Sequence, residues 1–128
     1  KSEEQLKAGE RNGAFIRWYE NGNKMIEAYY INGKQNGAYK EWFEDGTKKS
    51  EEQYKNGLKN GIFTRWYVNG FKFIEEHYKD GIEDGVFTTW YKDGNKETEI
   101  YYKIGKQISK FEWNEVYYKD EKLLLGLV

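Results

Sequence analysis

The residues of this chain that could take part in chemistry are mostly aromatic or acidic, and they recur at a fixed spacing. A tryptophan, a glutamate and a tyrosine each return every 24 residues. The positions are Trp18, Trp42, Trp66 and Trp90; Glu27, Glu51, Glu75 and Glu99; and Tyr30, Tyr54, Tyr78 and Tyr102. Tryptophan rings stack on sugar rings, on trimethylammonium groups and on the side chains of partner proteins. The pattern therefore favours binding over catalysis.

Nucleophilic catalysis finds little support in the composition. It needs a nucleophile, a base and a group that orients the base, but the chain has no cysteine and a single histidine. That histidine, His77, stands in a slot that Tyr29, Gln53 and Tyr101 fill in the other repeats, which favours a surface position. We therefore expect a protein that is not an enzyme.

Metal and cofactor sites are supported no better. Without cysteine, and with one histidine, carboxylates are almost the only metal ligands available. The sequence contains neither an EF-hand spacing nor a glycine loop that would bind phosphate. Glutamates that recur once per hairpin would lie about 10 Å apart in a sheet, too far to share one ion. Pairing with lysines such as Lys40 is the favoured interpretation, and we expect no cofactor and no metal.

The composition also bears on the class of partner. The net charge is −1, so no broad basic field exists to attract nucleic acid or anionic lipid. The longest apolar run, residues 123–125, is far too short to span a membrane. Aromatic residues make up 19% of the chain, which argues against disorder. We therefore expect a folded protein that binds no nucleic acid and has no membrane span.

The fixed spacing identifies the chain as a tandem array, because no insertion disturbs the 24-residue period across residues 1–106. We expect one repeat domain over residues 1–128. Its parts are a half repeat at 1–12, full repeats at 13–36, 37–60, 61–84 and 85–108, and a degenerate capping repeat at 109–128.

Each repeat predicts one β-hairpin. An aromatic-rich run leads to Asn-Gly or Asp-Gly, as at Asn21-Gly22, and these dipeptides suit type I′ turns. A second run ends in tyrosine, and the loop at 32–37 then reverses the chain again. The glycines assigned to turns are Gly22, Gly46, Gly70 and Gly94, with Gly13, Gly37, Gly61 and Gly85. Stacked hairpins predict an all-β fold: one elongated, twisted antiparallel meander sheet of about ten strands.

The turn at Asn21-Gly22 predicts the pairing of the two runs. The predicted pairs are Tyr19 with Lys24, Arg17 with Ile26, and Phe15 with Ala28. Because side chains alternate along a strand, the two faces of the sheet carry different residues. One face is expected to hold Phe15, Tyr19, Ile26 and Tyr30, and the other Ile16, Trp18, Met25 and Glu27.

Both ends of the chain depart from the repeat. At the C-terminal end Ser109 replaces the opening glycine, Phe111 is in phase, and Trp113 comes one residue early. The apolar segment 123–128 is interpreted as a cap over an open edge, with a binding strand for a partner as the alternative. At the other end KSEEQLKAGERNG matches the second half of a hairpin, which predicts either a piece of a longer array or the loss of the first hairpin with a leader. Its open edge, residues 1–8, can then pair with a second copy to form an edge-to-edge homodimer.

The repeat unit resembles the MORN repeat, in its bacterial variant. The resemblance rests on W-Y/F-x-N/D-G-x-K from Trp18 to Lys24, on E-x-x-Y-x-N/D-G from Glu27 to Gly33, on G-x-F/Y-x-x-W, and on their copies over residues 1–106. It implies an elongated sheet of hairpins and a role in protein interaction. Bacterial proteins similar to this one often carry the label antitoxin-like.

Two functions from different classes are compatible with the pattern. The first is a non-enzymatic repeat scaffold that binds another protein through aromatic ladders, since tryptophan and tyrosine are common hot-spot residues. The alternative is a surface module whose tryptophan ladder binds carbohydrate or choline. The tryptophans can also simply brace the sheet. The candidate binding residues are Trp18, Trp42, Trp66 and Trp90, with Tyr19, Phe43, Tyr67 and Tyr91.

Overall fold

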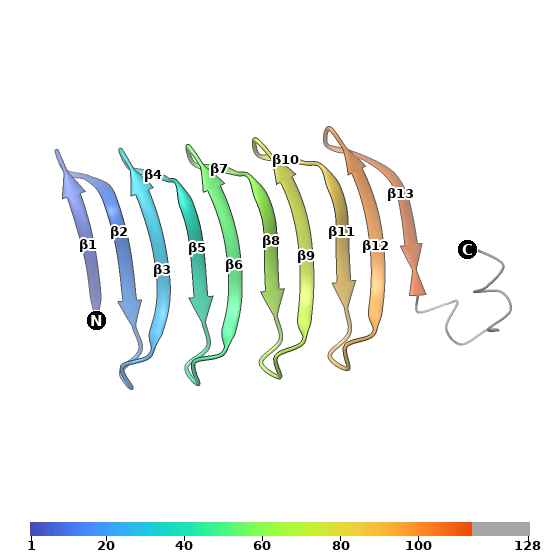
Figure 1. Cartoon of the computed structure of the whole chain (residues 1–128), viewed down its shortest axis with the longest axis horizontal. Helices are drawn as coiled ribbons and strands as arrows, with labels where there is room; N and C mark the ends of the chain where they lie inside the picture. The colour runs from blue at the N-terminus through green and yellow to red at the C-terminus, as the bar shows by residue number, and fades with distance from the viewer. Residues whose placement is uncertain (114–128) are drawn as a thin grey trace, which may run out of the picture.

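The computed structural model describes residues 1–113, which form one open antiparallel sheet (Figure 1). The strands are β1 (Ser2–Lys7), β2 (Glu10–Trp18), β3 (Lys24–Ile31), β4 (Lys34–Gln35), β5 (Gly37–Trp42), β6 (Lys48–Lys55), β7 (Leu58–Lys59), β8 (Gly61–Trp66), β9 (Lys72–Lys79), β10 (Ile82–Glu83), β11 (Gly85–Trp90), β12 (Lys96–Lys103) and β13 (Lys106–Glu112). Their order is β1-β2-β3-β5-β6-β8-β9-β11-β12-β13, and each of β4, β7 and β10 pairs with the strand before it. The predicted all-β meander of hairpins is confirmed.

The thirteen strands make ten passes across the sheet, because three passes are interrupted. β4 and β5 both pair with β3, and the ladder breaks at Asn36, whose amide donates to the carbonyl of Tyr29 at 2.8 Å. Gly37 follows with a φ of 109°, a conformation that glycine adopts far more readily than other residues. Gly13, Gly61 and Gly85 have the same conformation and also lie in strands.

The turn inside each hairpin differs from the predicted type I′ turn. The Gly22 amide donates to the Tyr19 carbonyl at 3.0 Å, and the Tyr19 amide donates to the Asn23 carbonyl at 2.9 Å. Only Gly22 has a positive φ, of 91°. The connection is therefore a three-residue loop, a type I turn followed by a left-handed glycine. The extra residue shifts the register, so Trp18 rather than Tyr19 lies opposite Lys24.

The other predicted pairs, Arg17 with Ile26 and Phe15 with Ala28, are confirmed. Type I′ geometry occurs at the opposite end of the sheet, in the reversal between hairpins. There both Asn32 and Gly33 have a positive φ, of 49° and 79°. The Gly33 amide donates to the Arg11 carbonyl at 2.8 Å, so each reversal is tied to the previous one.

The turns inside successive hairpins are also tied together, and this contact is testable. Asn69 accepts a hydrogen bond from the Phe71 amide at 3.1 Å and donates one from Nδ2 to the Lys92 carbonyl at 2.8 Å. Asn69→Asp keeps the first bond and loses the second, so we expect a loss of about 0.5–1 kcal/mol in the free energy of unfolding. Asn69→Ala loses both bonds and should cost more. Urea unfolding of the two variants checks this, and equal costs would contradict it.

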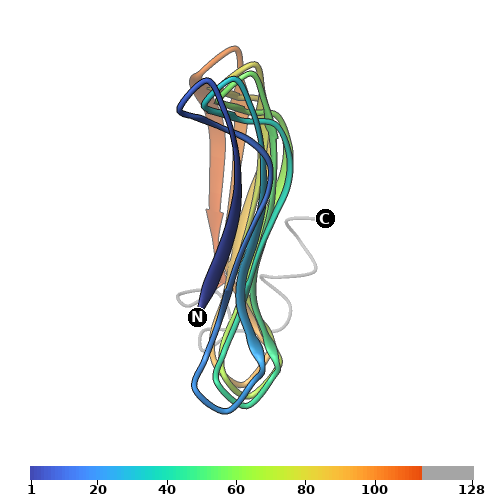
Figure 2. The ribbon, with the colours of Figure 1, turned by 90° about the vertical axis from the view of Figure 1, so that its left-hand side faces the viewer.

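The sheet is a single layer that bends toward both ends of its strands (Figure 2). We call one side the Tyr face. It carries Phe15, Tyr30, Tyr39, Tyr54, Phe63, Tyr78, Phe87 and Tyr102. We call the other side the Trp face. It carries Trp18, Trp42, Trp66 and Trp90 with Glu27, Glu51, Glu75 and Glu99. This separation is the predicted one, with one exception. The bulge beside Trp18 moves Met25 to the Tyr face. The equivalents of Met25, which are Lys49 and Phe73, line a hollow together with the Tyr-face residue Glu52.

The Tyr face supplies the core of the sheet. Ring centroids lie 5.3 Å apart for Tyr54 and Phe63, and 5.1 Å apart for Phe63 and Tyr78. The Lys59 ammonium lies 4.9 Å from the Phe63 ring centroid. As a result Phe63 is only 2% exposed, although residues 1–113 form no second layer over it. Large aromatic rings thus replace the aliphatic core that a single sheet lacks.

The phenols of this core make stability sensitive to alkaline pH. Burial, and then a hydrogen bond to a glutamate, raises the pKa of Tyr39, Tyr54 and Tyr78 above its ordinary value of about 10. The folded state then holds protons that the unfolded state releases. Its stability is fully present below pH 10 and falls as the pH rises further. We expect urea midpoints to drop above pH 10, less steeply in a variant with Tyr54 and Tyr78 replaced by phenylalanine. Identical slopes would contradict this.

The last described strand, β13, has its side chains on the opposite faces of the sheet from those of the equivalent strands β5, β8 and β11. At the other breaks, as at 36–37, the strand contains two more residues than the strand it pairs with. Side chains alternate every residue, so a shift of two residues keeps them on the same faces. β13 adds only Ile108, because Ser109 already pairs with Tyr101. Phe111 therefore lies opposite Glu99 on the Trp face, not on the Tyr ladder as its phase predicts. The predicted apolar cap at 123–128 lies outside the described residues.

Candidate functional site

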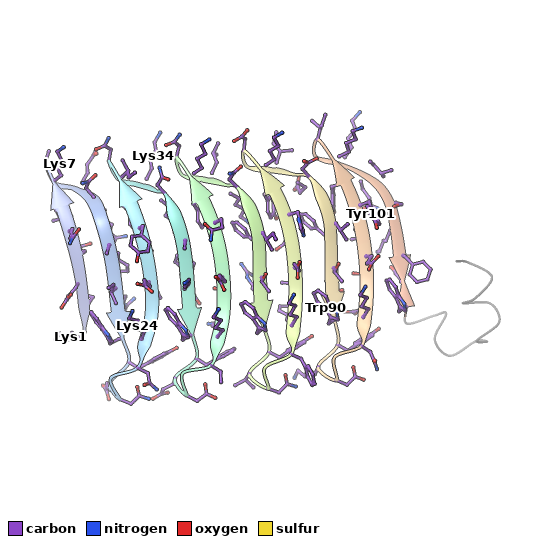
Figure 3. The ribbon with its side chains drawn as sticks, viewed as in Figure 1. Lys1, Lys7, Lys24, Lys34, Trp90 and Tyr101 are labelled. Atoms are coloured by element: carbon purple, nitrogen blue, oxygen red, sulfur yellow. The ribbon has the colours of Figure 1, made fainter. Side chains whose placement is uncertain are left out.

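The four repeated tryptophans form a row across the Trp face. Each is the last residue of its strand, β2, β5, β8 or β11, next to the turn inside the hairpin. Figure 3 shows Trp90 near those turns, with Tyr101 toward the other end of the strands. All four side chains are half-buried. Trp113, the residue after the inverted β13, extends the row, because the Lys96 ammonium lies 5.5 Å from its ring centroid, as Lys48 and Lys72 lie over Trp66 and Trp90.

A lysine lies over most of these rings. The Lys48 ammonium is 5.7 Å from the ring centroid of Trp66, and the Lys72 ammonium is 5.7 Å from that of Trp90. Each lysine also pairs with the glutamate three residues later, Lys48 with Glu51 at 2.9 Å and Lys72 with Glu75 at 2.7 Å. The Trp face therefore repeats a tryptophan–lysine–glutamate unit along the array.

The glutamates were predicted to pair with lysines such as Lys40. Lys40 does lie opposite Glu27 and Glu51 in the register. The ion pairs come instead from the lysine three residues before each glutamate, as in Lys24 with Glu27 at 3.6 Å. The hydrogen bond from Lys72 holds the pKa of Glu75 below its ordinary value. These carboxylates are thus neutralised by the row itself.

The second set of predicted binding residues lies on the opposite side of the sheet. Tyr19 donates from its hydroxyl to the Trp42 carbonyl at 2.7 Å, and Tyr67 donates to the Trp90 carbonyl at 2.7 Å. These tyrosines lie on the Tyr-face side of the sheet. The ring centroid of Tyr67, for example, is 5.0 Å from that of Phe73. Phe43 and Tyr91 occupy the equivalent positions and are half-buried. The structure therefore separates the two sets, and Tyr19 and Tyr67 brace one hairpin to the next.

The sequence interpretation missed a hollow on the Tyr face. Its volume is about 420 Å³. It is lined by Glu41, Phe43, Lys49, Ser50, Glu52, Arg65, Trp66 and Phe73. Its signal was present in the repeat: Ser50 stands where Ile26 and Ile74 stand in the neighbouring repeats, so a large side chain is missing from the sheet at this point.

In residues 1–113 no group of three or more histidine, aspartate or glutamate side chains is arranged to hold a metal ion.

No helix in the part of the chain that the structure describes is long and apolar enough to cross a membrane.

Comparison with known proteins agrees with the repeat geometry. No curated protein matches the chain significantly. The family described as MORN repeat variant matches residues 11–32, 35–56 and 83–103, together just over half of the 128 residues. Each match spans the two long strands of one hairpin and the turn between them, β2–β3, β5–β6 or β11–β12. The chain belongs to the MORN repeat variant family.

Proposed function

We propose that this chain is a non-enzymatic interaction module that binds another protein through the tryptophan row of the Trp face. The observation that carries the proposal is the row itself: four half-buried tryptophans in line on one side of an open sheet. Within residues 1–113 none of these four rings contacts another aromatic ring. The rings of Trp66 and Trp90 lie under lysines whose side chains are themselves about half exposed, 51% for Lys48 and 46% for Lys72.

This arrangement resembles the anatomy of a protein interface. Tryptophan is among the residues that most often dominate binding energy, and a rim of charged groups surrounds such hot spots. On the Trp face the rim consists of alternating lysine and glutamate, as in Lys72 and Glu75. A partner with both signs of charge around an apolar strip matches this surface.

The carbohydrate or choline alternative receives less support. A trimethylammonium ligand binds over the face of an aromatic ring, and the ammonium groups of Lys48 and Lys72 already lie over Trp66 and Trp90. Choline would have to displace a lysine that is also held by a glutamate. We expect no saturable change in tryptophan fluorescence on titration with choline or with glycans. A saturable change would favour the alternative.

The test of the proposal compares the affinity of one partner for matched variants. A protein captured on the wild-type chain is purified, and its Kd is measured for wild type, Trp66→Ala and Trp90→Ala. Hot-spot residues contribute about 2 kcal/mol or more, so each substitution should weaken binding at least about thirtyfold. Phe71→Ala, which removes a 51% exposed ring at a turn, is the control. Unchanged affinity in both tryptophan variants, with the fold intact by circular dichroism, would refute the proposal.

A further inference from the structure

The geometry points to a second binding site, on the Tyr face: the hollow above Ser50 takes a tyrosine side chain of a partner protein. The site is independent of the tryptophan row, which lies on the other face. Three features carry the inference: the small side chain of Ser50, the absence of a hydroxyl at Phe43, and the guanidinium of Arg65, which lies over no aromatic ring of residues 1–113. Each is recognised by comparing one repeat with the next.

The missing side chain creates the space. Ser50 lies between Glu41 and Arg65 in the register, in the slot of Ile26 and Ile74. The longer side chains of its neighbours rise around it, and Phe43 and Phe73 line the end nearest the turns. Pockets that bind ligands begin at about 300 Å³, so a hollow of about 420 Å³ has room for one aromatic side chain.

The missing hydroxyl is that of residue 43. Tyr19 and Tyr67 each reach across to the next hairpin and donate to a tryptophan carbonyl, at 2.7 Å in both cases. Phe43 occupies the same position one repeat later, and phenylalanine has no hydroxyl to donate. The equivalent acceptor is the carbonyl of Trp66, and Trp66 lines the hollow. A phenol entering here finds the acceptor that a tyrosine at 43 would have used.

The polar walls offer the same phenol two further partners. Glu52 is only 6% exposed, and its carboxylate already accepts the Tyr54 hydroxyl at 2.8 Å. Carboxylates accept several hydrogen bonds, so Glu52 retains capacity for a second hydroxyl. The Ser50 hydroxyl lines the hollow, and its oxygen can accept a hydrogen bond. The hydroxyl of a guest phenol therefore finds acceptors on the floor of the hollow, at Ser50, and on one wall, at Glu52.

Arg65 supplies the preference for an aromatic guest. On this face the rings of Phe15 and Phe63 are each accompanied by a cation, Arg11 at 4.4 Å and Lys59 at 4.9 Å from the ring centroid. Arg65 contacts Glu52 at 3.5 Å but lies over no ring of residues 1–113. A guest ring between Phe43 and Phe73 would give this guanidinium the stacking that the other cations have. Aromatic walls, a cation and hydroxyl acceptors together describe tyrosine rather than phenylalanine.

The experiment titrates the full chain with N-acetyl-tyrosinamide and follows the amide resonances of Ser50 and Arg65 by NMR. For a ligand of this size we expect saturable shifts with a Kd on the order of 1 mM. N-acetyl-phenylalaninamide should bind about fivefold more weakly, because it leaves the acceptors unpaired. Absence of saturable shifts, or equal affinity for the two amides, would overturn the inference.

Two substitutions and a control locate the site. Ser50→Ile restores the isoleucine of the neighbouring repeats and should weaken binding of N-acetyl-tyrosinamide more than about tenfold by filling the hollow. Phe43→Tyr places the chain's own hydroxyl on the Trp66 carbonyl and should narrow the difference between the two amides. Ser109→Ile makes the same chemical change in β13, away from the hollow, and should leave binding unchanged. Binding that survives Ser50→Ile would place the ligand elsewhere and overturn the assignment.

Discussion

Replacing Phe63 with alanine is expected to lower the free energy of unfolding by about 3–5 kcal/mol, which is the cost typical of removing a buried phenylalanine. Phe63 is the most buried large side chain described, at 2% exposed. Its ring touches Tyr54 on one side and Tyr78 on the other, so its loss interrupts the aromatic ladder at the centre of the array. In a single-layer sheet no second layer can relax into the space.

Urea unfolding followed by tryptophan fluorescence measures this loss. Phe71→Ala is the matched control, because Phe71 is 51% exposed at a turn and its loss should cost less than about 0.5 kcal/mol. Equal effects of the two substitutions would show that the Tyr ladder is not the core.

The second large effect is expected from Gly85→Ala, with a loss of about 2–3 kcal/mol. Gly85 has a φ of 114°, a conformation that costs an L-residue on the order of 1–3 kcal/mol. A Cβ at this position would also lie 3.2 Å from the Cβ of His77, so the neighbouring strand would have to shift. The break in each pass of the sheet therefore depends on its glycine.

The chain contains its own control for this substitution. Ser109 occupies the equivalent place in β13, where only one extra residue is accommodated and φ is not positive. Ser109→Ala should change the free energy of unfolding by less than about 0.5 kcal/mol. Both variants are compared by urea unfolding, and a loss from Gly85→Ala as small as that from Ser109→Ala would contradict the role assigned to the glycine.

Periodicity made the architecture predictable. Because Trp18 and its copies recur without insertion, one hairpin describes all of them, and alternation along each strand separates Phe15 from Trp18. The pairs Arg17 with Ile26 and Phe15 with Ala28 hold because the bulge beside Trp18 compensates for the extra residue of the turn. The local details depended on the turn type. Asn21-Gly22 is compatible with both a two-residue and a three-residue loop, and these differ by one residue in the adjacent register.

The site could be predicted only in part, for similar reasons. The tryptophan row follows from the period, but the lysine over each ring depends on a contact between neighbouring hairpins, as between Lys48 and Trp66. The inversion of β13 arises because its break adds one residue instead of two. Phe111 keeps the 24-residue spacing, so the spacing alone does not reveal this difference. The hollow at Ser50 was readable as a small residue in an isoleucine slot, but its walls come from four strands.

The proposed contact surface for the main protein partner is the Trp face, not the Tyr face. The chain has no native cysteine, so single cysteines can report on each face without interference. Gln53→Cys places an exposed thiol on the Trp face, opposite Ala38, and Arg17→Cys places one on the Tyr face, opposite Ile26.

The most direct measurement is the rate of alkylation of these two thiols with and without the purified partner. We expect the partner to slow alkylation at position 53 at least about tenfold, because an interface excludes water from the surface it covers, and to leave the rate at position 17 unchanged. Protection of position 17 with free reaction at position 53 would contradict the claim.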